Sequence, residues 1–534
     1  MKKKLLSLLF LVIPYITFAQ EQGLDQRIDE AFQPVSDFFT NVIFFLVWKE
    51  PNIPFVLILL VGSAAFFTLY FKFPNIRHFW TAISVVRGKY DHVDHAVVEP
   101  AYGDVTPGGD SIETIRDESE EGEVSHFQAL ATAVSGTVGN GNIAGVALAI
   151  ALGGPGATFW MIVCGLLGMS TKFVECTLGV QYRDVDENGV VYGGPMYYIS
   201  KGLKERGFAI FGKIAAVFFA IFCIGGSFGG GNAAQSNQAT IVLKELLGLE
   251  STSAGAIIGI IIAFIVGIII IGGIKRIAAV TEKVVPFMAV LYVVACLYII
   301  LSNFSLVDNA FGLIFQEAFK PTAIGVGSLI GVLLVGFQRA AFSNEAGAGS
   351  ASIAHSAVKT KYSASEGLVA LLEPFIDTVV ICTMTALVII IFNFGGFFAY
   401  GGDGTGAVMI EGIAYEGAGI TSKAFAQYIP YSNVFLTVAV FLFAISTMIS
   451  WSYYGLQSWK FLFGRGRTAD LVYKLLFCIF IVIGAAASMN SIWAFSDAMI
   501  FAMVFPNMVG LYFLFPVVKK QLNRYLDAIR TNKE

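Results

Sequence analysis

The chain has 534 residues, of which 56% are hydrophobic and only 13% are charged, and its mean hydropathy is +0.72. These fractions lie well beyond those of soluble domains, and the formal net charge of -4 gives no reason to expect a nucleic-acid partner. Because the apolar runs are continuous rather than alternating, they predict an all-α polytopic membrane protein rather than a β-barrel.

The first residues have the pattern of a secretory signal. Lysines at positions 2–4 precede a short apolar run, and the small residues Thr17 and Ala19 stand before a cleavage position at Gln20. This pattern predicts a signal peptide over residues 1–19. The alternative is an uncleaved extra helix, which is disfavoured because the apolar run is short for a membrane span.

Apolar stretches of about the length that crosses a bilayer follow along the chain. We expect eleven spans, at residues 54–72, 126–151, 156–180, 208–243, 254–272, 284–302, 323–350, 366–394, 432–458, 470–488 and 492–517. The resulting organisation is an extracellular N-terminus, first helix and acidic cytoplasmic loop (20–125), two groups of five helices (126–302 and 323–517) and a cytoplasmic tail (518–534). The acidic loop, from Asp91 to Glu123, has no function that its sequence reveals.

The distribution of lysine and arginine orients these spans. If the spans alternate and the C-terminus is cytoplasmic, almost all Lys and Arg residues outside the signal segment fall on the cytoplasmic side. The residues on the opposite side are Arg27, Lys49, Lys244, Lys320 and Lys423. This bias follows the positive-inside rule and predicts an inner-membrane protein with an extracytoplasmic mature N-terminus.

The second span contains the stretch SGTVGNGNIAGVA, from Ser135 to Ala147, which is unsuited to a regular helix. Glycines in a membrane helix often serve close helix packing, but these do not keep to one face and are interrupted by Asn140 and Asn142. The pattern predicts a helix that stops, runs extended and resumes. Such a break exposes N–H groups that suit an anion and carbonyl groups that suit a cation.

The seventh span repeats this pattern five spans later. Its stretch GFQRAAFSNEAGAGSAS, from Gly336 to Ser352, combines glycines with Asn344 and with the charged residues Arg339 and Glu345. Two interrupted helices in corresponding positions predict a 5+5 inverted repeat, with the first span as an addition. Arg339 and Glu345 are expected to form either a gate or a structural ion pair.

Several motifs closely resemble the alanine or glycine:cation symporter family. They are TVGNGNIAGVA, GGPGATFWM (Gly153 to Met161), GGPMYYI (Gly193 to Ile199), GGGNAAQSNQ (Gly229 to Gln238) and FSNEAGAGSASIAH (Phe342 to His355). The resemblance runs from about Ser125 to beyond Gly455. It implies a leucine-transporter-like fold and symport of small neutral amino acids with sodium as the coupling ion.

The same resemblance implies roles for particular residues. The substrate carboxylate is expected at the backbone of Gly139, Asn140 and Gly141, with Asn142 as a nearby polar ligand, Gln235 facing the substrate, and Thr447 and Trp451 closing the pocket. Sodium is expected between the carbonyls of Ser135 and Val138 and the hydroxyls of Ser446 and Thr447, because hard oxygen ligands suit a hard cation.

Some of these roles have structural alternatives. Gln235 could bond between helices instead of to a substrate, and Ser446 and Thr447 could bond back to their own helix. Asn140 stands where the family often has Thr or Leu, which leaves the preferred amino acid open.

Rival functions are a channel, a membrane enzyme and a proton-coupled symporter. The polar residues cluster rather than line a continuous pore, and no catalytic group assembles by motif around His126 or His355. Proton coupling remains the close rival because Glu345 and Asp377 are acidic residues in or near spans. The enantiomer that is preferred and the oligomeric state are not determined by the sequence.

Overall fold

The computed structural model describes residues 23–49, 52–94, 122–249, 251–320, 329–401 and 404–531. The predicted signal peptide and almost all of the acidic loop between Asp91 and Glu123 lie outside these ranges. Strands occur within them as three short antiparallel hairpins. These are β1 (Leu46–Lys49) with β2 (Asn52–Pro54), β3 (Asp184–Val185) with β4 (Val191–Tyr192), and β5 (Val408–Ile410) with β6 (Ile413–Tyr415).

Seven helical stretches of the described chain are long and apolar enough to cross a membrane. They are α9 (Gly156–Gln181), α11 to α12 (Ala209–Leu247), α14 (Gly273–Ser302), α18 to α20 (Ser363–Asn393), α22 (Ser432–Phe463), α23 (Arg467–Ala486) and α24 (Met489–Thr531). A bent pair and three shorter apolar helices, α3 (Phe55–Tyr70), α13 (Ala254–Ile270) and α16 (Leu329–Asn344), occupy the other expected positions. The prediction of an all-α polytopic membrane protein is confirmed.

The remaining helices are short or lie outside the expected spans. They are α2 (Leu24–Ile43), α4 (Pro74–Arg77), α5 (Phe79–Val86), α6 (Asp91–Asp94), α10 (Pro195–Glu205), α15 (Phe304–Phe319), α17 (Ala351–His355) and α21 (Ala418–Ala426). Helix α2 lies before the first predicted span and packs along α24. There the Ser36 hydroxyl donates to the Ser491 carbonyl at 2.8 Å, and Phe32 meets Phe495 edge to face at 5.2 Å.

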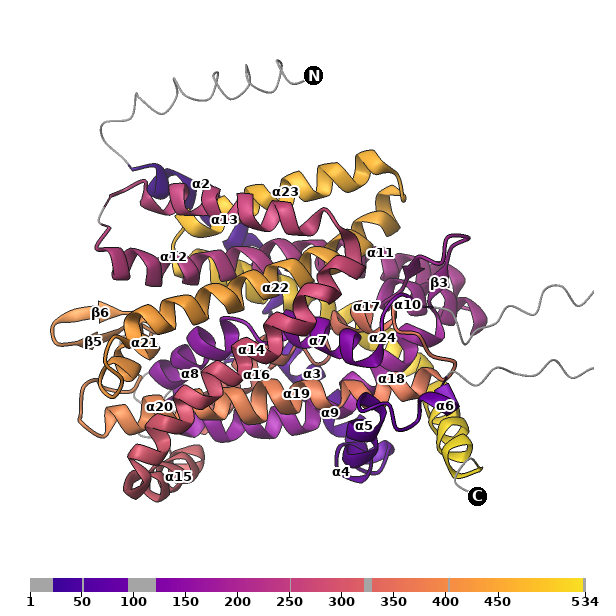
Figure 1. Cartoon of the computed structure of the whole chain (residues 1–534), viewed down its shortest axis with the longest axis horizontal. Coiled ribbons are helices and arrows are strands. Elements are labelled where there is room, and N and C mark those ends of the chain that lie inside the picture. The colour runs from indigo at the N-terminus through magenta and orange to yellow at the C-terminus, as the bar shows by residue number, and fades with distance from the viewer. Residues whose placement is uncertain are drawn as a thin grey trace, which may run out of the picture.

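The long helices pack side by side, and the connecting segments gather at two ends of the bundle (Figure 1). The β5–β6 hairpin and helices α15 and α21 lie at one end. Helices α6 and α10, strand β3 and the C-terminus lie at the other end.

The second predicted span is interrupted within the stretch from Ser135 to Ala147, as predicted. Helix α7 (His126–Thr137) begins with a capping box, in which the Ser125 hydroxyl accepts the Gln128 N–H and the Gln128 side chain accepts the Ser125 N–H. The chain then turns through Val138 to Asn140 and continues as the π-helical segment η2 (Gly141–Gly145) and helix α8 (Val146–Gly153). The two halves are bent by 50°.

The seventh predicted span is interrupted as well. Helix α16 ends at Asn344, Glu345 takes a left-handed backbone conformation with φ 55°, and Gly347 and Gly349 follow with φ 96° and 86°. The chain then resumes a helix as α17. A left-handed glutamate is uncommon, and backbone conformations of this kind concentrate at functional sites.

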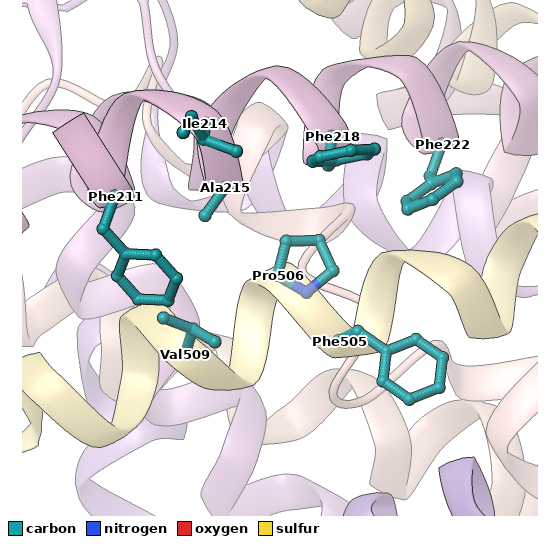
Figure 2. Close-up of a pocket in the computed structure, with 8 residues that line it drawn as sticks. All are labelled: Phe211, Ile214, Ala215, Phe218, Phe222, Phe505, Pro506 and Val509. Carbon is teal, nitrogen blue, oxygen red and sulfur yellow. The ribbon is translucent and has the colours of Figure 1, made fainter.

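An apolar groove of about 290 Å³ lies between α11 (Ala209–Phe228) and α24 (Figure 2). Its lining residues are Phe211, Ile214, Ala215, Phe218, Phe222, Phe505, Pro506 and Val509. None of them was predicted for the site, and a groove with this lining on a membrane-spanning bundle suits contact with lipid rather than with an amino acid.

Candidate substrate and cation site

The backbone groups that the first break frees are bound by nearby side chains. The Gly139 N–H donates to Asn142 Oδ1 at 2.9 Å, and the Asn140 N–H donates to Gln235 Oε1 at 2.9 Å. The side chain of Asn140 also donates to the Gln235 carbonyl at 3.2 Å. The structure therefore brings Gly139, Asn140, Asn142 and Gln235 together, with amide oxygens occupying two of the N–H groups expected to bind a carboxylate.

Gln235 reaches the break because the fourth span is irregular at that level. The glycine-rich segment η3 (Gly229–Ala233) is π-helical and precedes α12 (Ala234–Leu247). The Gln235 side chain donates to the Gly230 carbonyl at 2.8 Å, which leaves its oxygen facing Asn140. Single π-helical turns often mark functional positions in a helix.

Gly139 is surrounded so closely that no side chain fits there. A methyl group on Gly139 would lie 2.5 Å from Thr447 Oγ1 and 3.0 Å from Gln235 Oε1. Three elements thus converge on one glycine, which places Thr447 beside the break as expected.

Two of the predicted cation ligands, the Ser135 carbonyl and the Thr447 hydroxyl, meet between α7 and α22. The Thr447 hydroxyl donates to the Ser135 carbonyl at 3.0 Å, and the Ser135 hydroxyl donates to the Ser446 carbonyl at 2.7 Å. The Ser446 hydroxyl bonds back to the Phe443 carbonyl at 2.9 Å, which is the structural alternative foreseen for it. Val138 is buried directly after the end of α7.

The two breaks are joined through a carboxylate of the eighth span. Asp377 lies in the π-helical segment η5 (Phe375–Cys382). Its Oδ1 accepts a hydrogen bond from Asn142 Nδ2 at 2.7 Å. Its other oxygen accepts from the Ser343 hydroxyl at 2.9 Å and from the Thr378 hydroxyl at 2.7 Å. Gly141 of the first break also lies beside Ser343 of the second, because a methyl group on Gly141 would lie 3.6 Å from Ser343 Oγ.

Ser343 and Thr378 were not foreseen for the site. The clue available in the sequence was polar side chains within apolar spans, which also marks many residues that only bond between helices. Their common partner, Asp377, was noted only as a possible proton carrier.

Trp451 connects the ninth span to the second break. Its indole N–H donates to Glu345 Oε1 at 2.9 Å, and the Ser350 hydroxyl donates to Glu345 Oε2 at 2.5 Å. The ring is fully buried, and a methyl group on Gly231 would lie 2.2 Å from its Cγ atom. The indole is thus held on one edge by a carboxylate and on its face by a glycine backbone.

The suggested pairing of Arg339 with Glu345 is not the one that forms. Arg339 instead pairs with Asp497 of α24, which also accepts from Gln338 at 2.9 Å. The guanidinium lies 5.5 Å from the ring centre of Trp493. Arg339 and Glu345 differ because the helix ends between them: Arg339 stays in α16, whereas the left-handed turn at Glu345 directs the chain toward Trp451.

Comparison with known proteins places the chain in a family of transporters. The pattern of the Sodium:alanine symporter family matches residues 108–534. The sodium/alanine symporter AgcS of Methanococcus maripaludis is 38% identical over 92% of this chain and 98% of its own length. Two Bacillus subtilis proteins are also similar. GlnT, provisionally named a sodium/glutamine symporter, is 33% identical over 77% of this chain and 80% of its own length. YrbD, provisionally named a sodium/proton-dependent alanine carrier, is 35% identical over 76% of this chain and 81% of its own length.

Among solved structures, the chain aligns with MhsT in complex with L-phenylalanine at a TM-score of 0.48 and 14% identity, over 75% of this chain and 99% of that one. This likeness is too low to assign the fold or the ligand. The family match and the relatives above 30% identity cover most of the chain. The protein is therefore a multi-pass membrane transporter, not an enzyme, and it belongs to the sodium:alanine symporter family.

Proposed function

We propose that this protein takes up small neutral amino acids, chiefly alanine and glycine, by symport with sodium. The observation that carries the proposal is the meeting of both interrupted helices at one buried polar site, where Asp377 accepts hydrogen bonds from Asn142 and from Ser343. Backbone groups freed inside a membrane need polar partners, and a solute bound there supplies them. A channel would instead need a continuous polar pore.

The substrate carboxylate binds at the break in the second span. The N–H groups of Gly139 and Asn140 already bind the side-chain oxygens of Asn142 and Gln235. A carboxylate oxygen can replace either amide oxygen with a stronger, charge-assisted bond, and the N–H of Gly141 adjoins the same position. Substrate binding then releases the amide groups of Asn142 and Gln235 to contact the rest of the amino acid.

Trp451 sets the upper limit on substrate size. The indole is held by Glu345 and packs against Gly231, so it cannot move aside without losing a buried hydrogen bond. A rigid aromatic wall admits a methyl side chain more readily than a branched one. The test is uptake of alanine, glycine, leucine and glutamine by the same preparation, with Asn140→Thr as the variant that probes specificity within small amino acids.

Sodium is carried at the α7–α22 contact. The Ser135 carbonyl and the Thr447 hydroxyl are already within 3.0 Å of each other, and both are hard oxygen donors. The carbonyl of Val138 and the hydroxyl of Ser446 would supply further oxygens, the latter by turning away from the Phe443 carbonyl. A cation there would hold the half-helix α7 against α22 and so complete the substrate site.

The three shorter apolar helices complete a membrane domain of eleven spans. Helices α7 to α14 and α16 to α24 form the two halves of an inverted repeat, with α3 as the additional helix. The C-terminus lies on the cytoplasmic side of the bacterial plasma membrane, which fits the lysine and arginine bias. The bundle end with α6, α10 and the C-terminus in Figure 1 is then cytoplasmic.

The deciding experiment is uptake by purified protein in liposomes with external sodium replaced by potassium. Saturable alanine uptake that requires an inward sodium gradient supports the proposal. If uptake is unchanged when potassium replaces sodium, the proposed cation site is wrong. A flux that does not saturate with substrate concentration indicates a channel.

Proton coupling is the alternative function, and the hydrogen bonds of the Asp377 carboxylate favour it. The hydrogen-bond partners of the Asp377 carboxylate within the described residues are the neutral side chains of Asn142, Ser343 and Thr378. A buried carboxylate without a cationic partner is costly, and either a proton or a cation relieves it. Asp377→Asn discriminates: loss of uptake driven by a pH gradient in the absence of sodium would assign the coupling proton to this residue.

A further inference from the structure

A cluster of buried charged side chains lies outside the candidate site. We call it the Glu366 cluster, and its members are Asp94, His126, Lys172, His355, Glu366 and Glu373, of which none is more than 5% exposed. They come from α6, α7, α9, α17, α18 (Ser363–Ala370) and α19 (Leu372–Pro374). Buried ionisable groups inside a membrane protein are costly and by default functional.

Glu366 binds a histidine with each of its oxygens. Its Oε2 contacts His126 Nδ1, and its Oε1 lies 2.5 Å from His355 Nδ1. His126 is the first residue of α7, the half-helix before the first break, and His355 is the last residue of α17, the half-helix after the second break. One carboxylate therefore ties together the half-helices on the same side of both breaks.

The second nitrogen of each histidine faces another carboxylate. His126 Nε2 lies 3.6 Å from Asp94 Oδ2, and His355 Nε2 lies 3.8 Å from Glu373 Oε2. A neutral imidazole has a single N–H, whereas the imidazolium has two. An arrangement with carboxylates on both sides of each ring therefore favours the doubly protonated, cationic form of both histidines.

Lys172 continues the alternation of acids and bases, because its Nζ lies 3.0 Å from Glu373 Oε1. Asp94 is held at the other end by the hydroxyls of Thr360, at 3.1 Å, and Tyr525, at 3.2 Å. With both histidines charged, the cluster holds three positive and three negative side chains. Within the described residues, the titratable groups packed around it include Tyr90 and Asp91 beside Tyr525, and Glu175, Cys176, Tyr198, Glu345 and Tyr454 around Lys172 and Glu373.

We propose that the Glu366 cluster is a proton-dependent cytoplasmic gate, in which Glu366 is the positioning residue that holds α7 and α17 together while both histidines are charged. The proposal rests on the proposed function in one respect, since it takes this end of the bundle to be cytoplasmic. Loss of a proton from either histidine removes one of the two cationic partners of Glu366 and frees the half-helix that carries this histidine. The gate is held shut at low cytoplasmic pH and is released as that pH rises.

A break next to each half-helix makes this release possible without unfolding the bundle. Helix α7 is already bent by 50° relative to the segment after it, and α17 follows a turn with left-handed residues. Both can hinge at the breaks while the neighbouring halves stay packed. Because Ser135 of α7 carries the proposed sodium contact to Thr447, the same movement opens the cation site.

Hydrogen exchange of the full-length protein in lipid nanodiscs tests the gate without relying on transport. We expect Glu366→Gln to raise the rate of amide exchange in residues 126–137 and 351–355 by about a hundredfold. The reason is that Glu366 is the acidic partner in both buried ion pairs, with His126 and with His355. Glu317→Gln is the matched control, because Glu317 is also a buried glutamate but lies on α15. Unchanged protection of both segments in Glu366→Gln would overturn the proposal.

A second measurement uses the unaltered protein and therefore does not depend on the folding of a variant. Uptake in liposomes is measured while the pH on the C-terminal side is varied and the pH on the other side is fixed. We expect the maximal rate to change with this pH while the KM for external substrate stays constant, and His355→Gln to flatten the profile. If the maximal rate of the unaltered protein does not depend on this pH, the proton-dependent gate is refuted. If the protein takes up no amino acid at all, the proposed function is refuted, and the gate is then judged by the hydrogen-exchange result.

Discussion

Replacing Thr447 by valine tests the proposed sodium contact while changing the shape of the side chain little. The Thr447 hydroxyl donates to the Ser135 carbonyl at 3.0 Å, and both residues are at most 1% exposed. Valine removes the hydroxyl, which is one of the expected oxygen ligands of the cation. A polar contact to a charged group contributes about 1.5–3 kcal/mol. Since about 1.4 kcal/mol is a factor of ten, the sodium concentration for half-maximal uptake should rise about 10-fold to 150-fold.

The assay is alanine uptake into liposomes as a function of external sodium. Thr437→Val is the matched control on the same helix, because the Thr437 hydroxyl bonds back to the Asn433 carbonyl at 2.7 Å and is not part of the site. The control should keep the sodium dependence of the unaltered protein. If Thr447→Val also kept it, the assignment of the cation to the α7–α22 contact would be wrong.

Three further substitutions test other parts of the site. Gly139→Ala places a methyl group 2.5 Å from Thr447 Oγ1, so alanine uptake should fall sharply in protein that still purifies as a folded monodisperse species; normal uptake would contradict the packing argument. Trp451→Phe removes the donor to Glu345 and shortens the aromatic wall, so the ratio of leucine to alanine uptake should rise, and a constant ratio would remove Trp451 from size selection. Arg339→Gln should lower stability by about 3–5 kcal/mol in thermal unfolding, because it leaves Asp497 buried and unpaired; adding Asp497→Asn should recover part of the loss, and no recovery would show that the pair is not responsible.

The sequence alone determined the class of the protein and the location of its breaks. Continuous apolar stretches predicted the helices, because a bilayer allows few other ways to satisfy the backbone. The glycines and asparagines from Ser135 to Ala147 and from Gly336 to Ser352 predicted the interruptions, because these residues are poor helix formers wherever they stand. Both are local properties, and local properties can be recognised from neighbouring residues in the chain.

Only the tertiary structure decided which residues meet across the bundle. Asn142 and Asp377 are 235 positions apart in the chain, and His126 and Glu366 are 240 positions apart, yet each pair is in hydrogen-bond contact. Arg339 has Glu345 close in sequence but pairs with Asp497, because the helix ends between the first two and carries their side chains apart. Side-chain partners in a helical bundle depend on helix register and on the direction in which a broken helix resumes, and neither is recorded in the local sequence.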